Sequence, residues 1–121
     1  MLQIVFNEIS AAEISRLDTL DQLQVFEDFQ ITSEDLEKLD EKHFGELSRD
    51  GKKLYRFRSD EWRIYFEVVN KQVIVHRVLH KGTLSDFLYR SKLSSEDEAL
   101  SESKHFWSLI DEGRNAKQHQ D

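Results

Sequence analysis

Side chains that bind phosphate or move protons recur at short intervals in the middle of the chain. They are Arg56, Arg58, Arg63, Tyr65, His76 and His80. A guanidinium grips phosphate through two parallel hydrogen bonds, and it stays protonated at any ordinary pH. Tyrosine and histidine add groups that transfer protons or stack on bases. The set predicts a phosphate or RNA site if the fold gathers it on one surface.

Charge is distributed unevenly over the 121 residues, whose formal net charge is −7. Residues 51–92 hold ten basic and four acidic residues, whereas residues 1–50 and 93–121 are both acidic. At a Debye length of about 8 Å in physiological salt, a nearby polyanion would respond to the local basic field more than to the total. Acidic helices covering a basic sheet would give the same distribution, so the charge pattern leaves both interpretations open.

The elements that must position these residues follow from hydrophobic periodicity. The predicted strands are residues 2–6, 54–59, 62–69 and 72–80. Helices are predicted after the cap residues Ser10, Thr32 and Ser95, with a short closing element at 83–90 and a frayed tail at 113–121. Leu100, Phe106, Trp107 and Ile110 are the expected apolar anchors of the last helix. This order indicates one α+β domain.

Two predicted two-residue turns, at residues 60–61 and 70–71, set the pairing of the last three strands. Directly opposed residues of a hairpin share a face of the sheet. The first turn places Arg58 opposite Arg63 and Arg56 opposite Tyr65.

The second turn places Phe66 opposite Val75 and Trp62 opposite Leu79. One face is then apolar apart from Arg77, and comprises Trp62, Ile64, Phe66, Val68, Val73, Val75 and Leu79. The opposite face is polar and comprises Arg56, Arg58, Arg63, Tyr65, His76 and His80. Because a slip by one residue would bury the arginines, we expect helices to cover only the apolar face.

Other chemistry has less support in the sequence. His76 and His80 are about 13 Å apart along a strand, too far to bind one zinc ion, and the chain has no cysteine. The four glycines are isolated, so no phosphate-binding loop is indicated. We therefore expect neither a metal nor a cofactor. Glu67 or acidic residues of the tail could instead neutralise the arginines within the chain.

The run YRFRSDEWRIYFEVVNKQVIVHRVLHKGTLSDFLYR (Tyr55–Arg90) resembles the C-terminal sheet of the RelE/ParE toxin superfamily. The resemblance implies a RelE-like domain at residues 1–92, with the N-terminal strand and helices packed on one face of a small antiparallel sheet. Residues 93–121 would form an extra acidic C-terminal helix and a frayed tail. In ribosome-dependent members the ribose 2′-OH of mRNA attacks the adjacent phosphate, so the implied function is a ribosome-dependent mRNA endoribonuclease of a toxin–antitoxin system.

The resemblance also implies roles for individual residues. Arg56 and Arg58 match a basic pair on the first of these strands, and Arg63 would clamp the scissile phosphate. His80 or Lys81 matches a His-Arg pair, and Tyr89 matches a late tyrosine that could transfer a proton or stack on a base. Arg56, Tyr65 and His76 would contact substrate. Because arginine is a poor proton acceptor, the general base would be His80, His76 or Tyr89.

Three alternatives accompany this expectation. The chain could be a non-catalytic RelE-like module that binds protein or RNA, or a ParE-like gyrase inhibitor. The tail, residues 96–112, could cover the arginines as an acidic lid, or it could pack on the core through Phe106 and Trp107, away from the arginines; we favour the second arrangement. Expected partners are mRNA on the ribosome and a cognate antitoxin. No apolar run approaches the roughly 20 residues that span a bilayer, and we expect a cytoplasmic protein.

Overall fold

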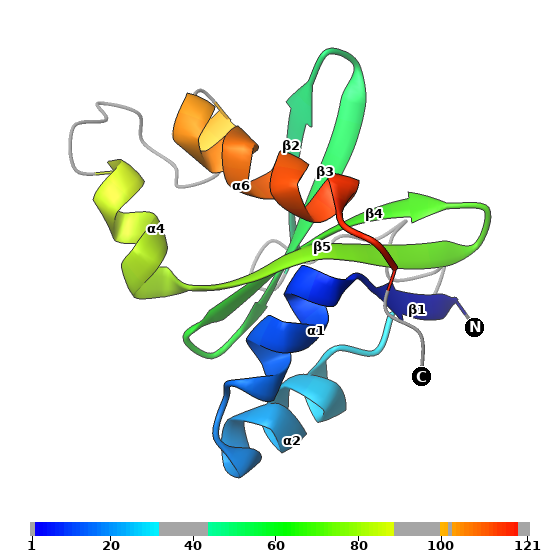
Figure 1. The fold of residues 1–121 in the computed structure, drawn as a ribbon, viewed down its shortest axis with the longest axis vertical. Coiled ribbons are helices and arrows are strands. Elements are labelled where there is room, and N and C mark those ends of the chain that lie inside the picture. The colour runs from blue at the N-terminus through cyan, green and yellow to red at the C-terminus, as the bar shows by residue number, and fades with distance from the viewer. Residues whose placement is uncertain (1, 32–43, 89–99, 102, 119–121) are drawn as a thin grey trace.

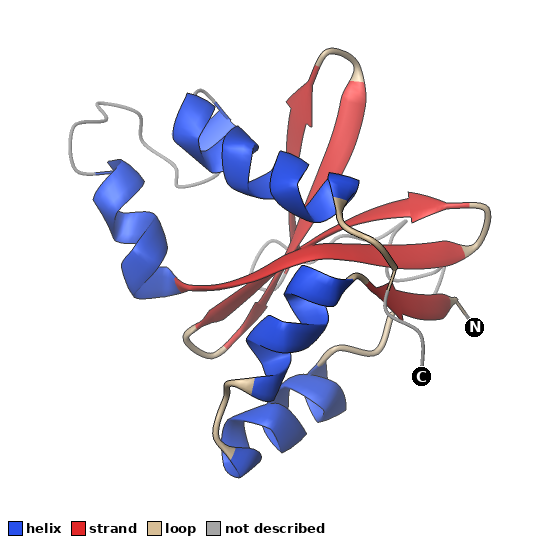
Figure 2. Cartoon of the chain, viewed as in Figure 1, coloured by secondary structure: helices blue, strands red, loops and turns tan. Residues whose placement is uncertain are grey.

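The computed structural model describes residues 2–31, 44–88, 100–101 and 103–118, and shows an α+β fold built on a five-stranded sheet (Figure 1). The strands are β1 (Gln3–Phe6), β2 (Phe44–Arg49), β3 (Lys52–Ser59), β4 (Trp62–Val69) and β5 (Gln72–His80). The helices are α1 (Glu8–Ser15), α2 (Thr19–Asp28), α4 (Lys81–Leu88) and α6 (Lys104–Asn115). Figure 2 shows how the helices are distributed around the sheet.

The sheet order is β1-β5-β4-β3-β2, and β1 runs parallel to β5 while the other neighbours are antiparallel. The sheet is therefore mixed, which corrects the expectation of an antiparallel sheet. β1 is joined to the rest of the sheet through α1 and α2 and not through a hairpin. Such a long connection allows β1 to lie parallel to β5, whereas hairpins give only antiparallel neighbours.

The turns at residues 60–61 and 70–71 are confirmed. Asp60, Asn70 and Lys71 adopt positive φ angles of 53°, 50° and 63°, which matches the strand twist in tight hairpins. A third hairpin turn, at Asp50 and Gly51, joins β3 to β2. The sequence pattern did not predict β2, whose residues (FGELSR) do not alternate regularly.

Two hydrophobic cores lie on opposite faces of the sheet, so the expectation that helices cover only one face is wrong. The first core joins β3, β4 and β5 to Ile14, Val25 and Phe29 of the N-terminal helices. The second core comprises Leu47, Leu54, Tyr65, Leu79, Leu84, Leu100, Phe106, Trp107 and Ile110. The C-terminal apolar anchors are thus confirmed as buried, and they pack on the second face.

Helix α1 begins one turn earlier than expected, at Glu8, because Asn7 is its N-cap. Asn7 Oδ1 accepts from the Ser10 backbone N–H at 2.7 Å, and Ser10 Oγ accepts from the Asn7 N–H at 3.0 Å. Ser10 therefore occupies the N3 position of the capping box rather than the cap itself. Its hydroxyl also donates to the Val75 carbonyl at 3.0 Å, which ties α1 to the edge of β5.

The tail is ordered further than expected. Helix α6 runs to Asn115, and the Glu8 N–H donates to the Lys117 carbonyl at 2.8 Å. The predicted fraying of residues 113–118 is therefore wrong, and 119–121 lie outside the described residues. The caps expected at Thr32 and Ser95 also lie outside them, whereas α6 is capped by Ser103. None of the described helices combines the length and hydropathy needed to cross a membrane.

Candidate functional site

The pairing of β3 with β4 confirms the predicted register. Arg58 lies opposite Arg63, and Arg56 lies opposite Tyr65. Three guanidinium groups and a phenol therefore occupy neighbouring positions on one face of two adjacent strands. We call Arg56, Arg58, Arg63 and Tyr65 the arginine face.

A β-bulge in β5 changes the second register. Phe66 pairs with Val75 as predicted, but Tyr65 pairs with Arg77, which leaves His76 as the extra residue. A bulge shifts every later residue to the opposite face. Trp62 consequently pairs with His80 and not with Leu79.

The bulge reassigns three side chains. His80 leaves the arginine face and packs edge-on to Trp62, with ring centroids 5.0 Å apart. Leu79 joins the second core, on the arginine face, and Arg77 also lies on that face, opposite Tyr65. The expectation that His80 shares a surface with the arginines is therefore wrong. Arg77 was the one charged residue on the predicted apolar face. Its presence there was the indication in the sequence that the predicted β4–β5 register is wrong at this point.

The arginine face is covered, contrary to the expectation of an open surface. Arg56 is 2% exposed, Arg63 9%, Tyr65 0% and His76 4%. Helix α6 lies over this face (Figure 1), and Phe106 packs against Tyr65 with ring centroids 4.9 Å apart. The interpretation that the C-terminal helix packs away from the arginines is thus wrong, although Phe106 and Trp107 do anchor it.

The C-terminal half of α6 is held unusually close to β5. A Cβ atom on Gly113 would lie 2.1 Å from the His76 carbonyl oxygen, so only glycine permits this approach. Asn7 Nδ2 lies 2.7 Å from the Gly113 carbonyl oxygen and 3.1 Å from that of His76. The Asn7 amide therefore joins α6, α1 and β5 at one point.

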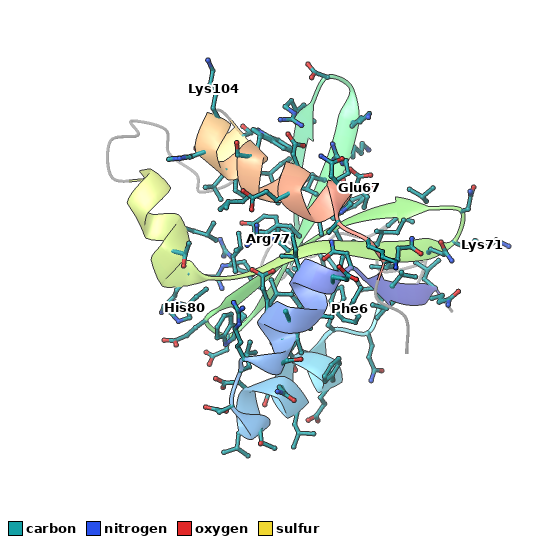
Figure 3. All side chains as sticks on the ribbon, viewed as in Figure 1. Phe6, Glu67, Lys71, Arg77, His80 and Lys104 are labelled. Carbon is teal, nitrogen blue, oxygen red and sulfur yellow. The ribbon has the colours of Figure 1, made fainter. Side chains whose placement is uncertain are left out.

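Arg77 makes a second attachment between these elements (Figure 3). Its guanidinium forms three hydrogen bonds with the Glu13 carboxylate, the shortest of 2.9 Å, and Nη1 donates to the Leu109 carbonyl at 3.1 Å. Glu112 of α6 lies 3.2 Å from the same Nη1. Glu13 of α1 and Glu112 of α6 thus neutralise Arg77, the charged residue that did not fit the predicted apolar face.

Ion pairs also connect α6 to β2 and β4. Arg49 donates to Asp111 at 2.7 Å, and Arg114 forms an ion pair with Glu67. The hydrogen bond from Arg49 is the main cause that lowers the pKa of the Asp111 carboxyl. Arg49 also lies 4.6 Å from the Trp107 ring centroid. The acidic Asp111 of α6 thus meets a basic residue of β2, and basic Arg114 of α6 meets an acidic residue of β4.

His76 is buried inside this network. Its Nε2 lies 3.5 Å from Glu67, and Arg114 and Asp111 of α6 also face it. Burial lowers the pKa of the His76 imidazole, and the Arg114 charge lowers it further, against the opposing influence of Glu67. His76 is therefore enclosed between β4 and α6.

A pH prediction follows for the stability of the fold. Because the pKa of His76 is lowered on folding, the unfolded chain binds a proton more readily below its ordinary pKa of about 6.5. The free energy of unfolding should therefore be fully retained above that pH and should fall as the pH drops below it. The total loss is about 1.4 kcal/mol for each unit by which folding lowers the pKa of His76. Urea denaturation at several pH values between 8 and 5.5 measures this slope.

The matched control for this prediction is His105→Gln, on the exposed side of α6. His76→Gln should flatten the decline in stability below pH 6.5, and His105→Gln should leave it unchanged. Equal slopes for the parent protein and His76→Gln would contradict the prediction.

The far end of β5 carries the remaining candidates, His80 and Lys81. His80 Nδ1 accepts from the Gly82 N–H at 2.9 Å, and Nε2 lies 3.2 Å from the Glu61 carboxylate. The hydrogen bond with His80, together with the Lys81 charge, lowers the pKa of Glu61. Since Nδ1 accepts, Nε2 carries the proton of the neutral ring. Both nitrogens are thus engaged, and His80 in this position cannot accept a proton from substrate.

Arg63 extends toward the same end of the sheet. Its Nη1 donates to the Asp60 carbonyl at 2.9 Å and to the Trp62 carbonyl at 3.1 Å, so the guanidinium is turned toward the β3–β4 turn. Arg58 beside it is half-buried. Tyr89, the expected proton-transfer tyrosine, lies outside the described residues.

The structure thus brings together Arg56, Arg58, Arg63, Tyr65 and His76 but separates His80 and Lys81 from them. Clustered guanidinium groups can stabilise the charge that develops on a phosphate under attack. Phe106 of α6 covers Tyr65 at the centre of the arginine face. Sequence reasoning did not identify Asn7, Glu13 or Gly113, whose importance depends on contacts between distant elements.

Comparisons of the chain with protein-family models, with curated proteins and with solved structures found no match. The functional interpretation therefore depends on the geometry of the arginine face and on the sequence pattern.

Proposed function

We propose that the chain is a RelE-like toxin: an endoribonuclease that cuts mRNA on the ribosome and that a cognate antitoxin restrains. The observation that supports this most is the β3–β4 register, which sets Arg56, Arg58 and Arg63 side by side on one face. Three permanently charged groups at that spacing suit the phosphates of a single RNA strand.

The proposed reaction is attack of a ribose 2′-OH on the adjacent phosphorus. The P–O5′ bond breaks and the leaving 5′ oxygen takes a proton from water, which leaves a cyclic phosphate and a free 5′-OH. Arg58 and Arg63 would stabilise the charge on the phosphorus-bound oxygens, and Arg56 would bind a neighbouring phosphate. The 2′ proton would pass to Tyr89, because His80 lies on the opposite face of the sheet from the arginines.

The structure corresponds to a closed form under this proposal. Arg56 and Tyr65 are fully covered, and Phe106 of α6 packs on Tyr65, so RNA would enter only after α6 as a whole separates from the sheet. The ion pairs of Asp111 with Arg49 and of Glu112 with Arg77 would break when α6 leaves. The ribosome or the substrate itself would supply the energy for opening.

Inducible expression in bacteria, followed by mapping of mRNA 5′ ends, tests the proposal. We expect the parent chain to arrest growth and to cut mRNA, and Arg58→Ala to reduce cutting by about 100-fold, the effect of losing one donor to the reacting phosphate. Arg58 is preferred to the more deeply buried Arg63 because its removal disturbs the fold less.

The control is Lys104→Ala, an equal loss of charge at the exposed start of α6 (Figure 3). It should leave cutting unchanged. Thermal unfolding of each variant checks that the fold is retained. Harmless expression of the parent chain without new mRNA ends, or full cutting by Arg58→Ala, would contradict the proposal.

A second candidate is a non-catalytic RelE-like module that binds RNA or protein. It is favoured by the engagement of both His80 ring nitrogens, which leaves no accepting atom toward the substrate. RNA binding by the purified protein that depends on Arg58, together with no cleavage on ribosomes, would support this candidate over the nuclease.

A further inference from the structure

The sheet contains a wedge-shaped gap between β3 and β4. The two strands pair from Ser59↔Trp62 to Tyr55↔Phe66 and then separate. Beyond that point Lys52–Leu54 pairs only with β2, and Glu67–Val69 pairs only with β5. Two strand edges of the described chain therefore face each other without a strand between them. Figure 1 shows the β2–β3 and β4–β5 hairpins diverging at this place.

The gap is an open hollow of about 560 Å³ lined by Lys52, Lys53, Tyr55, Glu67, Val68 and Arg114. Residues from both faces of the sheet contribute, because Lys52 and Glu67 lie on the arginine face whereas Lys53, Tyr55 and Val68 lie on the other. The hollow therefore passes between the strands and is not confined to one surface.

The two sides of the hollow differ in chemistry. On the arginine face it adjoins a smaller hollow of about 80 Å³ lined by Arg49, Asp50, Lys52, Trp107 and Arg114. Glu67 is already paired with Arg114, and Asp111 with Arg49, which leaves the exposed amine of Lys52 to attract a negative group. On the opposite face, Tyr55 and Val68 present apolar surface beside the exposed Lys53.

We propose that this gap binds an extended segment of a partner protein in which acidic and apolar residues alternate. The segment would enter as a strand between Lys52–Leu54 and Glu67–Val69 and hydrogen-bond to both edges. Successive side chains of a strand point to opposite faces, so its acidic residues would reach Lys52 and its apolar residues would reach Tyr55 and Val68. This site is separate from the arginine face and does not depend on RNA cleavage.

A labelled hexapeptide that alternates glutamate with valine is the probe, and its binding is followed by fluorescence anisotropy. We expect the full-length protein to bind it with a micromolar Kd. A double variant, Lys52→Glu with Lys53→Glu, should weaken binding at least tenfold, because it turns two attractive charges into repulsive ones. Lys104→Glu, at the other end of α6, should change it less than twofold (Figure 3).

Backbone pairing is tested with the same peptide carrying N-methyl groups on the valines, which keeps its charge but removes donors. The N-methylated peptide should not bind. Equal binding of both peptides would overturn the proposal, as would an equal effect of Lys52→Glu/Lys53→Glu and Lys104→Glu. A single-stranded RNA that loses affinity in the double variant, with no binding of the peptide, would assign the gap to nucleic acid and also overturn it. A dimer that the double variant abolishes, without peptide binding, would assign it to a second copy, with the same consequence.

Discussion

Replacing Gly113 by alanine is expected to release the C-terminal half of α6 from the sheet. The new Cβ would lie 2.1 Å from the His76 carbonyl oxygen and 2.8 Å from its carbonyl carbon, and backbone atoms cannot rotate away as a side chain can. We expect a loss of about 3 kcal/mol, the upper part of the range for overpacking. Since alanine favours a helix over glycine by about 1 kcal/mol, the loss would come from packing and not from helix propensity.

Thermal unfolding measures this effect, and we expect the Tm to fall by roughly 10 °C. Ser108→Ala, on the exposed side of α6, is the control and should shift the Tm by less than about 2 °C. Circular dichroism distinguishes displacement of α6 from global unfolding, because the sheet signal should persist. An unchanged Tm for Gly113→Ala would show that α6 does not approach β5 as closely as described.

Replacing Asn7 by aspartate should destabilise the fold by about 3 kcal/mol, although the two side chains have nearly the same shape. Asn7 Nδ2 lies within 3.2 Å of the carbonyl oxygens of Val75, His76 and Gly113. An aspartate would place a charged oxygen against all three and would remove the amide donor from them, at a position that is 3% exposed. Aspartate is as good an N-cap as asparagine, so the change isolates these contacts.

The matched control is Asp18→Asn, the reverse exchange at the exposed N-cap of α2, where the side chain accepts from the Asp21 N–H. We expect that variant to change the free energy of unfolding by less than about 0.5 kcal/mol. Urea denaturation of both variants provides the comparison. Similar small effects at both caps would contradict the described junction of α1, β5 and α6.

The hairpins could be predicted from the sequence because their determinants are local. The strands predicted at 62–69 and 72–80, and the register of Arg58 with Arg63, agree with the structure. Turn residues at fixed positions and alternating side chains determine both features. The cap of α1 was misplaced by three residues, because several polar residues near the helix start are suitable caps.

The covering of the arginine face could not be predicted in the same way. Phe106, Trp107 and Ile110 showed that the last helix has an apolar side, but not which face of the sheet receives it. The second face also carries the apolar side chains of Leu54 and Tyr65, which are buried beneath α6. The arginines on the same face need charge partners. The bulge at His76 also moved Leu79 onto this face, which adds to the apolar surface that the last helix covers.

The proposal that the arginine face contacts RNA after α6 opens is tested most directly by RNA affinity. A labelled single-stranded RNA is titrated with the parent protein, with Gly113→Ala, and with Gly113→Ala combined with Arg58→Ala. We predict that Gly113→Ala binds at least tenfold more tightly than the parent, and that adding Arg58→Ala removes the gain. Equal affinity of the parent and Gly113→Ala, or a gain that persists without Arg58, would contradict the account.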